Sequence, residues 1–319
     1  MGSSVGDQGC CDGSTLMSQR QRNLLGWAAV ELSTLVACFW AFWGVLENFH
    51  EGWYGHALWQ NLAMMLHYQL MTIVFVAAAL IGIRWPVVGG GVHLAAALLA
   101  LWFFRAASAL LQYPFIIGPL ALMGVCYGFG RLQPRRRAAG IVVGLPLLTI
   151  FAFGVEPAYR VSQRKDDGDR SARRIAGNGV DLIWAPEGPG WPRDGVTWEE
   201  AQRRCRYLAA DGMSLSDAPQ DVWRLPTVEE AVRSMHRHGQ HCGGTWDAAR
   251  RRASYERRPD KESPLWDVHS LVIYWWTAIE VNEREAFIIV YDGKAWPRPK
   301  SLRMSSLVFR AVRDGETGK

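Results

Sequence analysis

The chain has 319 residues and a net charge of +5, and its mean hydropathy is near zero. That average hides two halves, because residues 24–155 are almost all apolar and residues 156–319 hold most of the charge. The basic residues are scattered and include no aromatic-basic RNA-binding motif, which excludes nucleic acid as an expected partner. The length and the composition break near residue 156 together predict two domains.

The N-terminal half reads as a membrane domain. Residues 1–23 are a polar tail that we expect to be disordered, with Met17 as an alternative start. Apolar segments of the length that crosses a bilayer as a helix, about 20 residues, then follow at 24–46, 61–83, 86–104, 109–129 and 139–155. They lack the polar faces of a soluble helical bundle. Residues 24–156 are therefore predicted to form an all-α bundle of about five transmembrane helices in the lipid bilayer.

The distribution of arginine predicts the orientation of this bundle. Arg20 and Arg22 precede the first span, and Arg131 and Arg135 to Arg137 lie in the fourth connection. Because short cytoplasmic loops are rich in Lys and Arg, both regions are expected in the cytoplasm. Five spans then place the C-terminal domain outside, in the periplasm or extracellular space. One span fewer would make that domain cytoplasmic, and the basic segment after the last span favours this alternative.

Three ionisable residues fall within the apolar segments, namely Glu31, His67 and His93. Such residues are costly in lipid and point to function. Glu31 is a candidate proton or ligand site, and the alternative is that it pairs with one of the histidines inside the bundle. Two glycine patterns, Gly89-Gly90-Gly91 and Gly124-x-x-x-Gly128, are compatible with close helix contact.

The C-terminal half predicts an α+β domain. We expect a charged linker at 157–178 and a strand at 179–184. Thr197 with Glu200, and Thr227 with Glu230, have the spacing of capping boxes and start two helices. A polar loop is expected at 236–264. The period then changes to two, predicting antiparallel strands at 272–279, 286–291 and 307–312, with a hairpin turn at Asp292-Gly293.

This order of motifs resembles the DUF1566 family, named for the C-terminal domain of the Legionella collagen-like adhesin. The residues that carry the resemblance are Ile183-Trp184, Thr197-Trp198-Glu199-Glu200-Ala201, Cys205, Trp223-Arg224-Leu225-Pro226-Thr227, Tyr274-Trp275-Trp276-Thr277, Tyr291-Asp292-Gly293 and Phe309-Arg310-Ala311-Val312-Arg313. It implies a C-type-lectin-like fold for residues 179–314. The resemblance does not include the predicted membrane half, for which the sequence suggests no family. The motifs of calcium-dependent sugar binding are absent.

The resemblance also bears on the cysteines. Ala311 stands where family members often have the cysteine that could meet Cys205. In an oxidising compartment, Cys242 is then the remaining partner for a disulfide with Cys205. The alternative is that Cys205 is simply buried on an apolar helix face.

No motif supports catalysis or a cofactor. Neither a nucleophile with its base nor paired carboxylates occur in a supporting context, so we expect no enzyme activity. His236, His238 and His241 cluster near Cys242, but their spacing is a weak zinc signal, and no metal is expected.

The conspicuous aromatic and arginine residues are expected to be mainly structural. Trp223, Arg224 and Pro226 should form a corner, with Trp223 in the core and Arg224 bridging backbone carbonyls. Trp275 and Trp276 alternate along a strand, so one is expected to be buried and the other exposed. Trp296, beside two prolines, is a candidate ligand contact.

The candidate binding region is the loop at 236–264, which carries Arg250, Arg251, Arg252, Arg257 and Arg258. This charge favours an anionic glycan or anionic headgroups, and the alternative is a solvated charged loop. We therefore expect a protein of the bacterial inner membrane that recognises an external glycan or protein ligand, with the bundle as anchor or signal transmitter and homo-oligomers as an option. The competing hypothesis is a transporter-like or channel-like bundle with a regulatory soluble cap.

Overall fold

The computed structural model describes residues 17–105 and 113–315. The chain divides into two compact units. The helical unit comprises Met1–Leu46 and His67–Gly154, and the C-terminal unit comprises Glu47–Leu66 and Val155–Lys319. The segment between the first two apolar stretches therefore belongs with the C-terminal unit, which the sequence did not predict. Residues 1–16 of the predicted tail lie outside the described residues. The first helix begins at Gln19, so residues 19–23 of that tail are helical.

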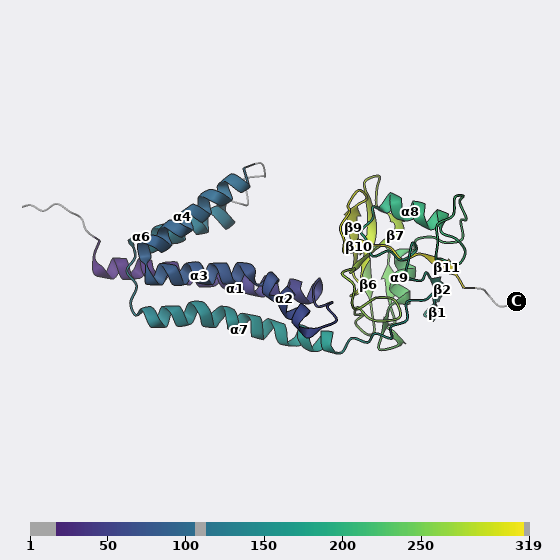
Figure 1. Ribbon diagram of the computed structural model, residues 1–319, viewed down its shortest axis with the longest axis horizontal. Helices are drawn as coiled ribbons and strands as arrows, with labels where there is room; N and C mark the ends of the chain where they lie inside the picture. The colour runs from purple at the N-terminus through teal and green to yellow at the C-terminus, as the bar shows by residue number, and fades with distance from the viewer. Residues whose placement is uncertain (1–16, 106–112, 316–319) are drawn as a thin grey trace, which may run out of the picture. The chain divides into compact units, whose positions relative to one another are not determined.

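The helices of the N-terminal half follow one another with short connections (Figure 1). They are α1 (Gln19–His50), α2 (Leu58–Tyr68), α3 (Leu70–Arg84), α4 (Pro86–Phe103), the π-helix η1 (Tyr113–Ile117), α6 (Gly118–Phe129) and α7 (Arg135–Ser162). Proline at the first position of α4 suits a helix start, because its missing N–H would have no partner there.

Within the described residues, three helices, α1, α4 and α7, are long and apolar enough to cross a membrane. Only 22% of the apolar window of α4 and 17% of that of α7 is buried, so large apolar side chains such as Leu98 and Phe151 are exposed. Apolar surface of this extent marks an interaction surface, and helices of this length and hydropathy fit a lipid environment. The helical unit thus carries candidate membrane spans.

The second predicted span is broken, and only part of the fourth is described. Helices α2 and α3 together would form a span, but they are bent by 54° where they meet at Gln69. The Gln69 side chain is buried, donating from Nε2 to the Ala41 carbonyl at 3.2 Å and accepting from Thr72 Oγ1 at 2.8 Å. A buried amide requires such partners, and this one finds them where the helix breaks. Helical residues of the fourth stretch run from Tyr113 to Phe129, and 109–112 lie outside the described residues.

Helices α1 and α7 run side by side in the same direction. Near their starts, Arg131 N donates to the Arg22 carbonyl at 2.9 Å, and Trp27 Nε1 donates to the Gln133 carbonyl at 3.1 Å. Further along both helices, the rings of Phe42 and Phe153 meet edge to face with centroids 4.8 Å apart. Two helices that touch near their starts and again further along must be parallel.

Helices α4 and α6 pack closely through their glycines, as the glycine patterns predicted. A Cβ on Gly90 would lie 2.8 Å from the Gly124 carbonyl oxygen and 2.9 Å from Gly128 Cα. Any larger residue at position 90 would therefore push the two helices apart.

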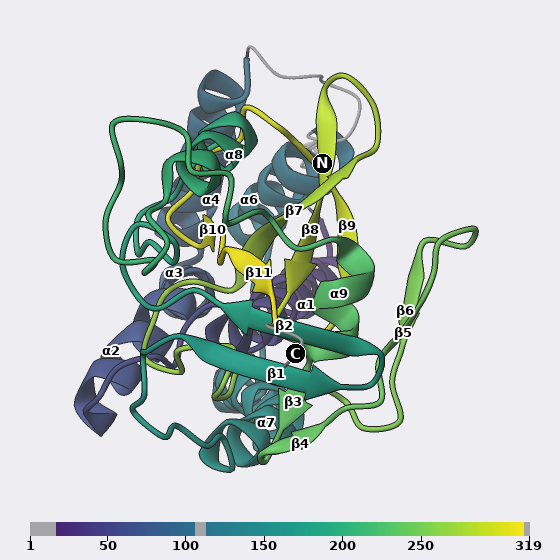
Figure 2. The same ribbon diagram turned by 90° about the vertical axis from the view of Figure 1, so that its right-hand side faces the viewer.

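The C-terminal unit is an α+β structure with four small sheets (Figure 2). Its helices are α8 (Trp198–Tyr207) and α9 (Val228–Ser234). The main sheet has the order β10-β7-β8-β9, from Leu307–Val308, Tyr274–Glu280, Glu285–Val290 and Ala295–Pro299. A second has the order β1-β2-β11, from Arg173–Gly177, Val180–Trp184 and Val312–Asp314. Two ribbons pair β3 (His236–Arg237) with β4 (Gln240–His241), and β5 (Thr245–Asp247) with β6 (Arg252–Ser254).

Several boundaries differ from the sequence prediction. The expected linker at 157–178 contains the end of α7 and all of β1, which pairs with β2. The expected strand at 307–312 divides into β10 and β11, which belong to different sheets. The expected loop at 236–264 holds both ribbons.

The core of this unit is built on tryptophan. Trp275 stacks on Trp266 with ring centroids 3.8 Å apart, while Trp276 donates from Nε1 to the Val196 carbonyl at 2.9 Å. Both are fully buried, so the prediction that one would be exposed is wrong. Successive side chains of a strand face opposite sides of the sheet, and here both sides of β7 are covered.

A buried arginine bridges backbone carbonyls, but it is Arg310 and not Arg224. The Arg310 side chain is fully buried and donates to the carbonyls of Ala185, Pro264 and Leu265 at 2.6–2.9 Å. Its guanidinium lies 3.8 Å from the centre of the Trp191 ring. These contacts replace the hydration that a buried cation loses. Arg224 instead pairs with the carboxylates of Glu230 and Asp314, each at 2.7 Å.

The capping box is complete at α9, but at α8 only one of its two hydrogen bonds forms. At α9, Thr227 and Glu230 form both hydrogen bonds of a capping box. At α8, Thr197 Oγ1 accepts from Glu200 N at 3.3 Å, but the Glu200 carboxylate pairs with Arg203 and Arg204. Trp223 is buried as predicted and donates from Nε1 to the Ala209 carbonyl at 2.9 Å.

Candidate functional site

One face of the C-terminal unit holds the ends of α1 and α7, and we call it the stem face. It consists of Asp260, His269, Tyr274 and Tyr291 with the residues of 47–57 and 160–170 that they contact. Both groups belong to the C-terminal unit itself.

The first contact of the stem face is a histidine held by two tyrosines. His50, the last residue of α1, has Nδ1 3.1 Å from Tyr291 Oη and Nε2 3.1 Å from Tyr274 Oη. Tyr274 begins β7 and Tyr291 directly follows β8. Burial raises the pKa of each tyrosine to about 12, so both hydroxyls stay protonated at neutral pH. A neutral imidazole has one donor and one acceptor, so one tyrosine accepts from His50 and the other donates to it.

A second contact of the stem face pairs two histidine rings. His56 stacks on His269 with centroids 4.1 Å apart and planes 24° from parallel. The Nδ1 of His269 is 3.2 Å from the Tyr54 carbonyl oxygen. Because a carbonyl only accepts, Nδ1 must carry the proton in this contact. The 51–57 segment is therefore held by a defined tautomer of His269.

The strongest contact of the stem face is a buried ion pair. Arg164, just after α7, places Nη2 2.8 Å from Asp260 Oδ1, and the two side chains are 3% and 1% exposed. Arg160, in the last turns of α7, adds a contact of 3.5 Å to Oδ2. Arg164 also lies 5.3 Å from the centre of the Tyr291 ring. Tyr291 thus contacts both His50 and Arg164, and so links the ends of the two helices.

The loop after α7 is fastened by further charges. Arg170 pairs with Asp166 at 2.8 Å and with Asp267 at 2.7 Å. Ser263 Oγ donates to Asp166 at 3.1 Å. The hydrogen bonds from Arg170 hold the pKa of Asp166 at about 2. The expected linker is therefore an ordered part of the stem face.

Asp260 belongs to a charged run, Asp260-Lys261-Glu262, in which each residue is only 1% exposed. Lys261 Nζ donates to the Ser270 carbonyl, and the Glu262 carboxylate accepts from the His238 backbone N–H at 2.8 Å. Burial, followed by the neighbouring Arg164, lowers the pKa of Lys261 to about 7. Sequence reasoning assigned this run to a polar loop, and it carries no local signal of burial. The partners that compensate Asp260 lie about 100 residues earlier in the chain.

The five arginines proposed for ligand binding in the predicted loop are all exposed. Arg250, Arg251 and Arg252 lie at the turn and the second strand of the β5–β6 hairpin, which extends away from the main sheet in Figure 2. Arg257 donates to Gln240 Oε1 at 2.7 Å, and the Arg258 carbonyl accepts from Arg237. The loop thus gathers five exposed guanidinium groups on one segment.

Trp296 is not part of this basic segment. It pairs with Ile288 across β8 and β9, and its ring meets Tyr274 with centroids 6.1 Å apart. The hairpin instead contacts Phe287, through Trp246 and through Arg251, which lies 5.8 Å from the ring centre. Phe287 and Ile288 are successive strand residues and face opposite sides of the sheet, so the hairpin and Trp296 lie on opposite faces.

The three ionisable residues of the apolar segments do not come together. Glu31 and His67 are exposed, whereas His93 is buried. His93 Nδ1 is 2.8 Å from the Gly89 carbonyl, and its ring faces Tyr127, whose hydroxyl is 3.1 Å from Ser33 Oγ. Within 17–105 and 113–315, no hydrogen bond or ion pair joins Glu31 to either histidine, so the predicted pairing is not formed.

The predicted disulfide is not formed either. Cys205 and Cys242 are free and buried in the same core. Burial raises the pKa of both thiols, that of Cys242 to about 11. At the weak zinc candidate, the rings of His236 and His241 meet at an angle of 47° with centroids 4.0 Å apart. Their ring nitrogens approach the carbonyls of Ser234 and Ala176. Among the described residues, no three metal-binding side chains converge.

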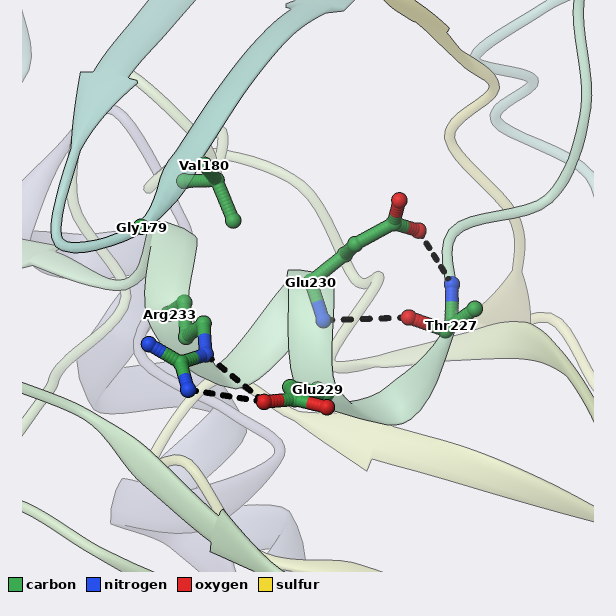
Figure 3. Close-up of a pocket in the computed structure, with 6 residues that line it drawn as sticks. All are labelled: Gly179, Val180, Thr227, Glu229, Glu230 and Arg233. Carbon is green, nitrogen blue, oxygen red and sulfur yellow. Dashed lines mark hydrogen bonds and ion pairs between the residues drawn. The ribbon is translucent and has the colours of Figure 1, made fainter.

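A pocket of about 360 Å³ lies beside the start of α9 (Figure 3). Its polar groups are already engaged: Glu230 with Thr227 and Arg224, and Arg233 with Glu229 and the Asn178 carbonyl. Because these charged side chains pair with one another, we interpret them as the groups that cap and stabilise α9, and not as a ligand site.

Comparison with known protein families gives one match. A family model described as a domain of unknown function, DUF7670, matches residues 17–139. No curated protein matches the chain. The match falls in the apolar N-terminal half, where the sequence suggested no family, and it is to DUF7670, not DUF1566. The identification of residues 179–314 as a DUF1566 domain of C-type-lectin-like fold is therefore wrong. In the most specific of the motifs that carried it, Trp223-Arg224-Leu225-Pro226-Thr227, Trp223 and Leu225 are buried and Thr227 caps α9.

The buried amine of Lys261 predicts a specific dependence of stability on pH. The unfolded chain has a lysine pKa near 10.4, so between about pH 7 and pH 10 it binds a proton that the folded chain does not. Unfolding free energy should then rise with pH in this window, by up to about 1.4 kcal/mol per pH unit. We expect Lys261→Met to remove this rise in urea unfolding of the detergent-solubilised chain at pH 7, 8 and 9.

The control is Lys294→Met, because the Lys294 side chain is 64% exposed. It should keep the wild-type slope. Equal slopes for the wild type and Lys261→Met would contradict a neutral buried amine.

Proposed function

We propose that this chain is a membrane-anchored receptor whose C-terminal unit binds an anionic ligand and whose helix ends carry the response. The observation that carries the proposal is the stem face. There, Asp260, Tyr274 and Tyr291 hold the end of α1 and the residues that follow α7. A binding event that shifts this face would move both helix ends directly, because no free linker intervenes. We propose a binding role for the unit and not a catalytic one.

We propose that the ligand binds at the basic segment formed by the β5–β6 hairpin with Arg257 and Arg258. Five exposed arginines support this, and the clearest is Arg250, which is 83% exposed and has only a loose contact of 3.6 Å with Asp247. Exposed positive charge of this density attracts anionic polymers or headgroups. An anionic glycan is the class of ligand that fits a unit outside the cell. The proposal is compatible with a homo-oligomer.

We also propose five membrane passes, with the N-terminus in the cytoplasm of a bacterial inner-membrane protein. The parallel direction of α1 and α7 supports an odd number of passes. Pro86 and Val87 line one hollow with Arg22 and Arg131, which puts the α3–α4 turn at the arginine-rich end. The chain then leaves along α4 and returns along α6 to Arg131. Arginine-rich ends are cytoplasmic, so the C-terminal unit would lie in the periplasm.

A transporter-like bundle is the second candidate, favoured by the buried polar series of Ser33, Tyr127 and His93. Buried polar groups in a bundle mark substrate or proton pathways. The receptor leads because Glu31 and His67 lie on the exposed surface and do not extend this series.

The hairpin proposal predicts a selective loss of binding. Replacing Arg250, Arg251 and Arg252 with serine should weaken binding of the full chain to dextran sulfate by roughly tenfold or more at low salt, and less at physiological salt. The control replaces Arg203, Arg206 and Arg284, which are exposed elsewhere on the unit. Similar losses in both triple variants would mean that only net charge matters, and unchanged binding would remove the hairpin from the site.

The topology predicts the result of reporter fusions after residue 319. A fused alkaline phosphatase should be active, because that enzyme needs an oxidising compartment. A fusion to a reporter that fluoresces only in the cytoplasm should be dark. The reverse pattern would place the C-terminal unit in the cytoplasm and reject the five-pass arrangement.

A further inference from the structure

A second hollow, of about 440 Å³, lies at the arginine-rich end of the helical unit, and we call it the arginine pocket. Three arginines are among the residues that line it: Arg22 on α1, Arg131 in the connection after α6, and Arg135 at the start of α7. Gln19 and Gln133 also line it. Among the described residues, no Asp or Glu lines the hollow.

The backbone builds this pocket. Arg131 N donates to the Arg22 carbonyl at 2.9 Å, and Gln133 N donates to Asn23 Oδ1 at 2.9 Å. Gly130 allows the close approach, because a Cβ there would lie 2.8 Å from Gly26 N. Arg22 and Arg131, more than 100 residues apart in sequence, are thus fixed beside each other by contacts that do not involve their side chains.

The charge of the pocket is uncompensated. Across residues 17–105 and 113–315, none of Arg22, Arg131 and Arg135 makes an ion pair. Gathering three like charges around one hollow is unfavourable until an anion enters it. Guanidinium groups with amides suit the oxygens of a phosphate, which accept bidentate hydrogen bonds.

The remaining wall of the pocket is apolar and exposed. Val87 and Phe129 also line it, and they are 78% and 64% exposed. A soluble phosphate would gain nothing from these side chains, whereas acyl chains would cover them. Basic pockets between helices on the cytoplasmic side are typical sites for anionic headgroups.

We infer that the arginine pocket binds the phosphate-bearing headgroup of an anionic phospholipid of the inner leaflet. The lipid would neutralise the three arginines and join α1, α6 and α7 at this end. The inference requires the helices to lie in a bilayer, and it does not depend on which ligand the C-terminal unit binds.

The test compares two triple variants of the full chain in nanodiscs. Arg22, Arg131 and Arg135 are replaced with glutamine in one, and Arg20, Arg136 and Arg137 in the other, which removes the same charge from the same end. The readout is native mass spectrometry of retained lipid, with phosphatidylglycerol titrated against phosphatidylcholine. We expect the wild type and the second variant to retain phosphatidylglycerol selectively. The pocket variant should lose that selectivity by at least about tenfold.

Other arms separate the source of the phosphate. Inorganic phosphate should compete poorly, and equal competition by it would assign the pocket to a free anion and overturn the lipid inference. Equal losses in both triple variants, or no preference in the wild type, would overturn it too. If the glutamine variant does not fold, replacement of the same three arginines with lysine keeps the charge but not the bidentate geometry. Selectivity should still fall, and unchanged selectivity would count against the site.

Discussion

The arrangement of the C-terminal unit depends on the burial of one carboxylate. Asp260 is 1% exposed, and a charge removed from water is stable only when it is paired and hydrogen-bonded. Its partners are Arg164 and Arg160, which come from the end of α7 and the residues just beyond it. The unit therefore completes its own interior only by taking in the end of a helix whose earlier part belongs to the candidate membrane spans.

This constraint explains why the C-terminal ends of α1 and α7 meet in one unit. Arg164 lies against the Tyr291 ring, and the Tyr291 hydroxyl contacts His50 at the end of α1. Loss of the ion pair would disturb the ring, and through it the histidine. The side chains of this network therefore move together. The receptor proposal requires such coupled movement of the segment that transmits the signal. The arginine pocket at the opposite end of α1 and α7 would give the same two helices a second fixed point.

The sequence predicted the features that have local causes. The caps at Thr197 and Thr227, the core position of Trp223 and the close contact at Gly90 follow from neighbours within a few residues or from the absence of a side chain. The sequence-based prediction failed where residues far apart in the chain determine the local structure. β1 looks like a basic linker until β2 pairs with it, and Asp260-Lys261-Glu262 looks like a solvated run until Arg164 reaches it. Gln69 was a visible signal for the break in the second apolar segment, because a lone amide in such a run must find partners. The family resemblance depended on short motifs, and the most specific of them, Trp223 to Thr227, has the local roles of a core tryptophan and a helix cap.

A double-mutant cycle between Arg164 and Asp260 tests the central claim most directly. Arg164→Ala, Asp260→Ala and the double variant would each be unfolded with urea in detergent, and their free energies compared with that of the wild type. A buried, specific pair should give an interaction energy of about 1.5 kcal/mol or more, with Asp260→Ala alone costing about 3–5 kcal/mol. Additivity of the two single changes within about 0.5 kcal/mol would mean that the end of α7 is not held by Asp260, and would contradict the account.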